Sequence, residues 1–472
     1  MKYEAVIGIE IHCELKTQTK MYSGAPSTYG EKPNTAINEI DLAYPGTMPQ
    51  VNKEAVRYGY RIARALNCEI QEILRFDRKN YFYSDLPKGY QITQEYYPLG
   101  VRGNIDIFVD EDLIPVRIHR IHLEEDTAKQ FHEADHTLID FNRSGTPLVE
   151  IVTEADFRTG AQAASYVDAI RQLVIYLGVS DGRMAEGSLR CDVNISLREK
   201  GTETFGTKVE IKNLNAISNV EKSIEYEIER QSMILDRGEA IESETRRFDE
   251  KTQETVLMRK KDGVVDYRYL PDALIPPTRI PEDIVNEAWI ETPQERLNRY
   301  KETLSLSHYD ANVLVRNKEV SDYFDLVLNE TDNTKLVLNW ITQELLSVMD
   351  QKGDVPLTSW IKVHDFVDFI KAIESKEIST RQAKEVFEEM LKGQSPKKII
   401  KDKGMVQVGD EAILTQWIEQ VLAENPRAIE DHRNGLPSAE KFVTGQVMRL
   451  SKGQANPQFT NKLVKQLLDK AL

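Results

Sequence analysis

Apolar and polar residues alternate along several short segments in the first 290 residues of the chain. In residues 6–15, every second position from Ile7 to Ile11 is isoleucine. This period of two predicts a half-buried β-strand, because successive side chains of a strand point to opposite faces. The isoleucines therefore face a core, and Glu10 and His12 lie together on the polar side.

Two later segments repeat this arrangement. Residues 189–196 place apolar side chains on one face and Arg190 and Asp192 on the other. Residues 208–212 place Glu210 on the polar face of another strand pattern. We therefore expect carboxylates from separate strands to share the polar face of a sheet.

Other segments have helical periodicity. Apolar residues recur every three or four positions in residues 161–178 and 220–237. After about residue 292 glycine becomes scarce, and helix-forming residues dominate. The pattern predicts an α+β protein with a helical middle and a small helical tail, divided at residues 1–291, 292–405 and 406–472.

Composition narrows the class of protein. With 40% apolar residues, the chain is typical of a globular protein, and it has neither an apolar run that could span a membrane nor a signal-peptide pattern. We therefore expect a cytoplasmic protein without a membrane partner. Its three cysteines form no CxxC pair, which argues against structural zinc and disulfides and predicts buried, inert thiols at Cys13 and Cys191.

The formal net charge of −16 is the wrong sign for a protein that binds nucleic acid with its whole surface. Residues 441–472 differ, because basic residues there outnumber acids. Lys441, Arg449 and Lys452 are candidate RNA-binding residues in this tail. The alternative interpretation is an ordinary solvated helical face.

The acids suggest a chemistry. Those on or beside the predicted polar faces are Glu10, Glu124, Glu125, Asp192 and Glu210. Carboxylates suit Mg²⁺, which takes oxygen ligands together with phosphates. The cations Arg190 and Lys208 on the same faces suit contacts to phosphate. The competing interpretation is a solvated sheet face with cross-strand ion pairs.

Two further stretches have a composition that could suit a ligand. Residues 76–91 mix aromatic and basic side chains around a Pro-Lys-Gly turn, a combination that can stack an unpaired nucleotide end. A buried strand with a polar loop explains that stretch equally well. Residues 201–208 approach a phosphate-binding loop, but the order Gly-Thr-Lys is wrong and predicts a hairpin loop. We find no stretch suited to an amidase nucleophile, so any ammonia must come from another chain.

Longer motifs give a resemblance. Asp77–Tyr83, followed by Asp85–Gln91, is similar to the signature of the GatB family, the B subunits of aspartyl/glutamyl-tRNA amidotransferase. Further similar motifs cover nearly the full length: Val6–Glu14, Asp41–Gly46, Leu123–Asp126, Asn142–Leu148, Glu186–Asp192, Glu210–Asn215, Glu244–Phe248, Tyr267–Tyr269, Gly445–Met448 and Lys452–Pro457. One departure stands at Leu274, where the family usually has an acid.

The resemblance implies a fold and an activity. The large first domain is expected to be a cradle on an antiparallel sheet, and the YqeY-like tail is expected to hold tRNA. The family uses ATP to phosphorylate the side-chain carboxylate of Glu or Asp wrongly attached to tRNA-Gln or tRNA-Asn. Ammonia made by the glutaminase, the A subunit, then gives the amide, and the small C subunit holds this heterotrimer together.

The resemblance also implies roles for residues. Glu10, His12, Glu125 and Asp192 are expected near the metal, followed by Glu124 and Glu210, and Lys79 and Lys88 along the ammonia route. Mg²⁺ is the expected ion, with Mn²⁺ as the alternative because of His12. Two other functions remain open: a non-catalytic tRNA-binding scaffold or divergent paralogue, and an amide ligase for a free amino acid.

Overall fold

The computed structural model describes residues 2–109, 112–260, 266–405, 411–434, 436, 438–451 and 455–470. The chain divides into two compact units, Met1–Arg296 and Leu297–Leu472. The first unit is mixed α and β, and the second is helical within the described residues. The expected α+β class is confirmed, whereas the three-part division remains a prediction.

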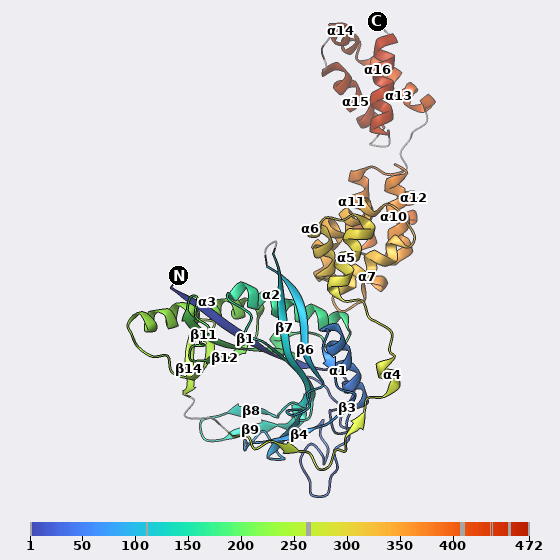
Figure 1. Ribbon diagram of the computed structural model, residues 1–472. Coiled ribbons are helices and arrows are strands. Elements are labelled where there is room, and N and C mark those ends of the chain that lie inside the picture. Colours follow the sequence, from blue (N-terminus) through green and yellow to red (C-terminus); the bar gives the residue numbers. More distant parts are fainter. Residues whose placement is uncertain are drawn as a thin grey trace. The chain divides into compact units, whose positions relative to one another are not determined.

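A nine-stranded sheet forms the first unit, with the order β14-β13-β12-β11-β1-β10-β7-β6-β2 (Figure 1). Only β12 and β13 pair in parallel; the other neighbours are antiparallel. The strands are β1 (Tyr3–Glu14), β2 (Glu69–Ile70), β6 (Gly100–Val109), β7 (Asp112–Glu125), β10 (Pro147–Thr153), β11 (Leu189–Glu199), β12 (Val209–Leu214), β13 (Glu244–Asp249) and β14 (Glu254–Lys260). The sheet curves around an open concave side, as the family resemblance implied.

The alternating segments form neighbouring strands in the middle of this sheet. Ile7, Ile9 and Ile11 on β1 are at most 1% exposed, and so are Cys191 and Val193 on β11. Burial of these apolar side chains fixes the register, because a slip by one residue would turn each of them to the polar face. The predicted strands and the buried thiols of Cys13 and Cys191 are confirmed.

Three helices cover the apolar face: α1 (Lys53–Ala65), α2 (Gly160–Tyr176) and α3 (Ile217–Asp236). α1 packs on β7, α2 on β6 and β1, and α3 on β11. Side chains cap two of them: Asn52 accepts from the Glu54 and Ala55 amides, and Thr159 accepts from the Gln162 amide. The two predicted helices are confirmed, each starting slightly earlier than the pattern suggested.

The first unit also contains three smaller sheets. β15 (Leu270–Pro271), β4 (Asp77–Asn80) and β5 (Tyr90–Thr93) form one three-stranded sheet. The remaining pairs are β3 (Ile73–Leu74) with β16 (Thr278–Arg279), and β8 (Lys129–His132) with β9 (Thr137–Asp140). Residues 200–208 connect β11 to the antiparallel β12, which confirms the hairpin interpretation.

The second unit begins within α5, after the short helix α4 (Glu282–Val285) of the first. Its helices are α5 (Pro293–Leu304), α6 (His308–Val315), α7 (Lys318–Leu328), α8 (Thr334–Asn339), α9 (Leu357–Trp360), α10 (Val363–Glu374), α11 (Thr380–Met390), α12 (Pro396–Asp402), α13 (Glu411–Glu424), α14 (Arg427–Arg433), α15 (Ser438–Leu450) and α16 (Pro457–Lys470). Trp340 packs against Phe369 and Phe387, with ring centroids 4.7 and 5.6 Å away. From Trp340 the chain continues as a π-helical and then a 3₁₀ segment.

α13 to α16 share an apolar cluster of their own. Its members include Leu414 and Ile418 on α13, Val443 and Val447 on α15, and Val464 on α16. The predicted boundary after residue 405 adjoins residues 406–410, which lie outside the described residues. Within the described part of the chain, no helix is long and apolar enough to cross a membrane.

Candidate active site

Four neighbouring strands bring polar side chains to one face of the large sheet. His12 on β1 lies opposite Arg190 on β11 and opposite Glu150 on β10. Glu150 in turn lies opposite His122 on β7. Directly opposite residues point to the same face, so this register forms a polar row across the sheet.

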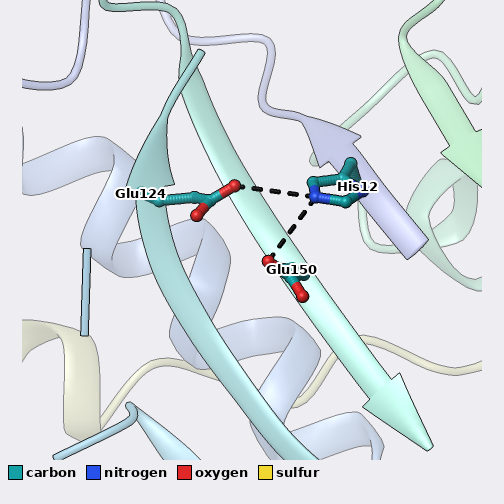
Figure 2. A group of neighbouring side chains, drawn as sticks. All are labelled: His12, Glu124 and Glu150. Carbon is teal, nitrogen blue, oxygen red and sulfur yellow. Dashed lines mark ion pairs between the residues drawn. The ribbon is translucent and has the colours of Figure 1, made fainter. Parts of the chain in front are cut away.

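The histidine–carboxylate group consists of His12, His122, Glu124 and Glu150. His12 Nε2 lies 3.8 Å from Glu124 Oε1 and 3.5 Å from Glu150 Oε2 (Figure 2). His122 Nε2 lies 3.5 Å from Glu124 Oε2 and 3.2 Å from the same Glu150 oxygen. One ligand atom each from His12, Glu124 and Glu150 lie within 4.8 Å of one another, a separation suitable for a shared cation.

Electrostatics in this group favour positive charge. Burial disfavours a charged imidazole, but the carboxylates of Glu150 and Glu124 outweigh it and raise the pKa of His12 to about 9. The same balance raises the pKa of His122 to about 9. Burial also opposes ionisation of Glu150, yet His122 and His12 hold its pKa well below the ordinary value.

The tricarboxylate group consists of Glu10, Asp192 and Glu210, whose oxygens also lie within 4.8 Å of one another. Glu10 lies directly opposite Asp192 in the β1–β11 register. Asn194 Nδ2 donates to Glu10 Oε1 over 2.8 Å. Lys212 Nζ lies 2.8 Å from Asp192 Oδ2 and 3.2 Å from Glu210 Oε1, so one ammonium neutralises part of the charge.

Neighbouring charges also shift the pKa values of residues in this group. Burial and the carboxylates of Glu150 and Asp192 raise the pKa of Glu10. Burial lowers the pKa of Lys212, but Asp192 and Glu210 outweigh it and raise that pKa above its ordinary value. The shifts of Glu10 and Lys212 are those expected beside excess negative charge.

The residues fit a divalent cation. Glu124, Glu150 and His12 supply two carboxylates and one imidazole, and the tricarboxylate group supplies oxygen alone. The raised pKa values of both histidines reflect the negative charge of the neighbouring carboxylates. In the described residues, buried His122 Nδ1 has no hydrogen-bond partner. Oxygen donors suit Mg²⁺, and the His12 nitrogen makes Mn²⁺ suitable too.

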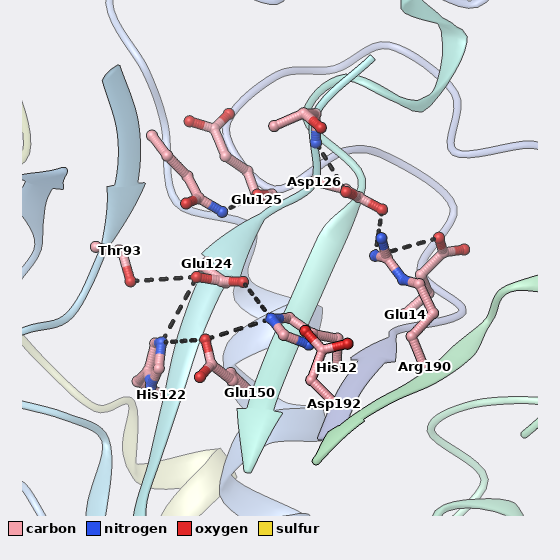
Figure 3. A network of polar contacts seen from close by, with 12 residues as sticks. His12, Glu14, Thr93, His122, Glu124, Glu125, Asp126, Glu150, Arg190 and Asp192 are labelled. Atoms are coloured by element: carbon pink, nitrogen blue, oxygen red, sulfur yellow. Dashed lines mark hydrogen bonds and ion pairs between the residues drawn. The ribbon is translucent and has the colours of Figure 1, made fainter. Parts of the chain in front are cut away.

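Arg190 lies beside a third set of acids. Its Nη2 is 2.5 Å from Asp126 Oδ2 and 3.9 Å from Glu14 Oε1 (Figure 3). Burial and the Asp126 carboxylate raise the pKa of Glu14 to about 8. Arg190 is therefore held at the edge of the polar row, and its predicted contact with phosphate remains a prediction.

Two of the predicted site residues, Glu125 and Lys208, lie outside both groups. Glu125 belongs to neither cation-binding group, because consecutive strand residues point to opposite faces and Glu124 takes the inner one. Lys88 Nζ lies 2.5 Å from both Glu125 oxygens. Lys208 precedes β12 and is exposed, whereas Lys212 contacts the acids.

Glu150 and His122 were not predicted from the sequence. Glu150 lies between buried Val149 and Ile151, the same alternation that identified Glu10, so its pattern was available. His122 precedes Glu124 by two residues, a spacing that puts both on one face of a strand. What the pattern lacked was the register that sets β10 between β1 and β7.

The remaining predicted residues lie elsewhere. Lys79 on β4 lies beside tyrosine rings. Lys441 and Arg449 are exposed on α15, and Lys452 lies outside the described residues.

Comparison with known proteins identifies the class. Residues 5–286 match the GatB/GatE catalytic domain, which spans the nine-stranded sheet and both groups, and residues 322–468 match the GatB domain. The first unit is thus a GatB/GatE-type catalytic domain.

The particular family follows from full-length relatives. The chain is 46% identical over 474 aligned residues to the aspartyl/glutamyl-tRNA(Asn/Gln) amidotransferase B subunits from Staphylococcus aureus strains JH9, Newman and N315, with 100% of each chain covered. The chain belongs to this family of amidotransferase B subunits, as its motifs predicted.

Proposed function

We propose that this chain converts misacylated Glu-tRNA(Gln), Asp-tRNA(Asn) or both to the amidated forms, using ATP. One observation carries the proposal. In a chain 46% identical to amidotransferase B subunits over its full length, the histidine–carboxylate and tricarboxylate groups meet on one face of one sheet. A scaffold that only bound RNA would gain nothing from carboxylates that repel phosphate.

The chemistry requires activation of a carboxylate. A carboxylate oxygen of the tRNA-bound Glu or Asp attacks the γ-phosphorus of ATP, which gives an acyl phosphate and ADP. Ammonia then attacks the acyl carbon, the C–O bond to phosphate breaks, and the amine loses a proton. The products are an amide and inorganic phosphate, so this route needs no oxidant or reductant.

His12, Glu124 and Glu150 are the proposed metal ligands, with Glu10, Asp192 and Glu210 as a second cation-binding set. A bound Mg²⁺ or Mn²⁺ supplies charge neutralisation for the phosphates of ATP.

Basic side chains of the protein add to the positive charge of the metal ion. Lys212 is placed to pair with a phosphoryl oxygen when it releases one of its carboxylates. Arg190, which pairs with Asp126, is proposed to contact phosphate as well. Both residues increase the positive charge that stabilises a phosphoryl group in transfer.

Lys79 and Lys88 are proposed to line the route by which ammonia arrives. Lys88 and Glu125 form an ion pair beside the end of β7, close to Glu124. A carboxylate beside such a route can accept the proton when ammonium arrives in place of ammonia.

The partners follow from the names of the relatives. A protein named as one lettered part of an amidotransferase implies further subunits and a tRNA. We assign the ammonia source to a glutaminase, the A subunit, and the assembly role to a small C subunit, and place the complex in the cytoplasm. The exposed Lys441 and Arg449 are proposed to contact tRNA.

A reconstituted assay tests the function. The chain, together with the A and C subunits, is supplied with ATP, Mg²⁺ and ammonium chloride, and each misacylated tRNA is followed to its amide. ATP-dependent conversion identifies the tRNA used. Retained tRNA binding without conversion of either substrate would favour the scaffold.

A further inference from the structure

A row of tyrosines lies along the small sheet formed by β15, β4 and β5. The row, here called the tyrosine platform, consists of Tyr81, Tyr267 and Tyr269. The ring centroids of Tyr81 and Tyr267, and of Tyr267 and Tyr269, are each 6.1 Å apart with edge-to-face geometry. The Asn80 amide donates to the Tyr267 carbonyl over 3.0 Å, so the segment before β15 extends the pairing with β4.

Cations border this platform. Lys79 Nζ lies 4.9 Å from the Tyr267 ring centroid and 6.0 Å from that of Tyr81. Arg268 stands between Tyr267 and Tyr269 in the sequence and is exposed. Across the described residues, neither Lys79 nor Arg268 has a carboxylate within ion-pair distance, although the chain carries a net charge of −16.

Two acids lie close to Tyr269 and Arg268: Glu95 pairs with Arg120, and Asp266 accepts the Arg268 amide. Arg120 Nη1 lies 2.9 Å from Glu95 Oε2. Within the described residues the platform therefore presents aromatic rings beside two cations that form no ion pair, the combination that binds single-stranded nucleic acid through stacking and phosphate contacts.

The backbone at the platform is also unusual. Arg268 has a φ of +45°, a left-handed conformation that residues other than glycine seldom adopt. Two hydrogen bonds hold it: the Arg268 amide donates to Asp266 Oδ1, and Asn80 Nδ2 donates to the Arg268 carbonyl. These two contacts fix the backbone of Arg268 between the two rings.

One end of the platform lies near the candidate active site. Thr93 on β5 of the same small sheet donates to Glu124 Oε2 over 3.4 Å, and burial together with the carboxylates of Glu95 and Glu150 raises the pKa of Tyr269. The other end continues to Tyr83, which is 59% exposed and has its ring centroid 6.0 Å from that of Tyr81. The rings thus lead from solvent toward the reacting groups.

We infer that the tyrosine platform binds the unpaired nucleotides at the 3′ end of the aminoacylated tRNA, with bases against the rings and a phosphate beside Arg268. This inference rests on the proposed function and adds where the acceptor end is held. A series of rings suits successive bases of a strand, whereas ATP offers one base. A terminal nucleotide beside Tyr269 also brings its attached amino acid toward Glu150.

The test uses the complete complex and compares Tyr267→Ala with Tyr267→Phe, which keeps the ring. Loss of one stacked base weakens binding by about tenfold. We expect KM for misacylated tRNA to rise about tenfold in Tyr267→Ala and less than about twofold in Tyr267→Phe, with KM for ATP unchanged in both. A rise in KM for ATP instead would mark the platform as an adenine subsite of ATP and overturn the inference.

A binding experiment keeps this test separate from the proposed function. Filter binding compares intact tRNA with tRNA shortened by its last nucleotides. We expect the wild-type complex to prefer intact tRNA and Tyr267→Ala to lose this preference. An unchanged preference in a folded variant, judged by its thermal unfolding, would overturn the inference even if no amide is formed by any complex.

The charge can be tested separately in case loss of the ring prevents folding. Arg268→Gln removes a cation that forms no ion pair among the described residues, and Arg279→Gln, its matched control, removes one that pairs with Glu72 over 3.2 Å. In a plot of log affinity against log salt, we expect the slope to fall by about one for Arg268→Gln and to stay unchanged for Arg279→Gln. Equal slopes for wild type and Arg268→Gln would refute the assigned phosphate contact.

Discussion

At the scale of single residues, the candidate active site depends on which of two consecutive acids faces inward. Glu124 contributes to the histidine–carboxylate group, while Glu125 is bound by Lys88. A strand cannot present both on one face, so the two carboxylates have different partners although they are neighbours in sequence. Lys208 and Lys212 differ for another reason: Lys208 precedes β12, whereas Lys212 lies within it.

Glu150 provides the sharpest residue-scale prediction. Glu150→Gln removes the charge that both histidines share, and we expect the rate of ATP-dependent amidation with ammonium to fall at least about 100-fold. The control is Glu154→Gln, an exposed acid that pairs with His119 outside both groups. Titration with Mn²⁺ by calorimetry provides a second readout. Wild-type rate and metal affinity in Glu150→Gln would exclude this carboxylate from the site.

The two lysines form a second, paired prediction. Lys212→Met leaves Asp192 and Glu210 without their shared ammonium, and we expect the amidation rate to drop about tenfold or more. Lys208→Met changes an exposed residue and is expected to stay within about twofold. Single-turnover assays with ammonium measure both variants. The reverse ranking would restore Lys208 as the phosphate contact.

At the scale of elements, a buried acid joins α3 to the edge of the large sheet. Glu227 is fully buried; its Oε1 lies 2.9 Å from Arg230 Nε and 3.2 Å from Arg246 Nε on β13. It also accepts a hydrogen bond from Thr255 on β14. Burial opposes ionisation, but Arg230 and its other donors hold the pKa of Glu227 below its ordinary value.

This arrangement predicts a dependence of stability on pH. A carboxylate whose pKa is lower in the folded state stabilises the fold above the unfolded pKa of about 4.5, and this contribution disappears as pH falls through the folded pKa. We expect Glu227→Gln to lower the free energy of unfolding at pH 7 by about 2 kcal/mol, because two half-buried guanidinium groups lose one carboxylate partner and keep only Glu244.

Urea unfolding at pH 7 and at pH 4 tests this prediction. The difference between wild type and Glu227→Gln should shrink at the lower pH. The matched control is Glu229→Gln, an exposed position on the same helix, for which we expect a change below about 0.5 kcal/mol. A difference that grows toward pH 4 would contradict the assigned sign.

At the scale of the whole molecule, an acidic protein must still bind RNA. With a net charge of −16, most of the surface repels phosphate, so binding depends on local cations and is strongly dependent on salt. The exposed Lys441 and Arg449 on α15 are such cations. Deleting residues 441–472 would be a poor test, because it removes Val447 and Val464 from the apolar cluster of α13 to α16.

Substitution is the better experiment for the tail. We expect Lys441→Gln combined with Arg449→Gln to reduce the salt slope of tRNA binding by about two, and to leave amidation at saturating tRNA unchanged. Lys200→Gln combined with Lys222→Gln, two exposed cations of the first unit, serves as the control. Equal slopes for wild type and the tail variant would argue against tRNA contact there.

The sequence by itself determined the local elements and the family. Alternation at Ile7, Ile9 and Ile11 fixed a strand and the side on which Glu10 and His12 lie, because burial of apolar side chains sets the face. The motifs over the whole length predicted a member of the amidotransferase B subunits, which the full-length relatives confirmed.

Only the tertiary structure decided which side chains meet. β1, β10 and β11 are neighbours although more than 130 residues separate β1 from the other two in sequence, and that register brings His12 to Glu150 and Glu10 to Asp192. Periodicity gives the face of each strand but not its neighbour, since pairing depends on long-range packing and hydrogen bonds. For the same reason the sequence supplied the acids, and the fold alone divided them into two groups.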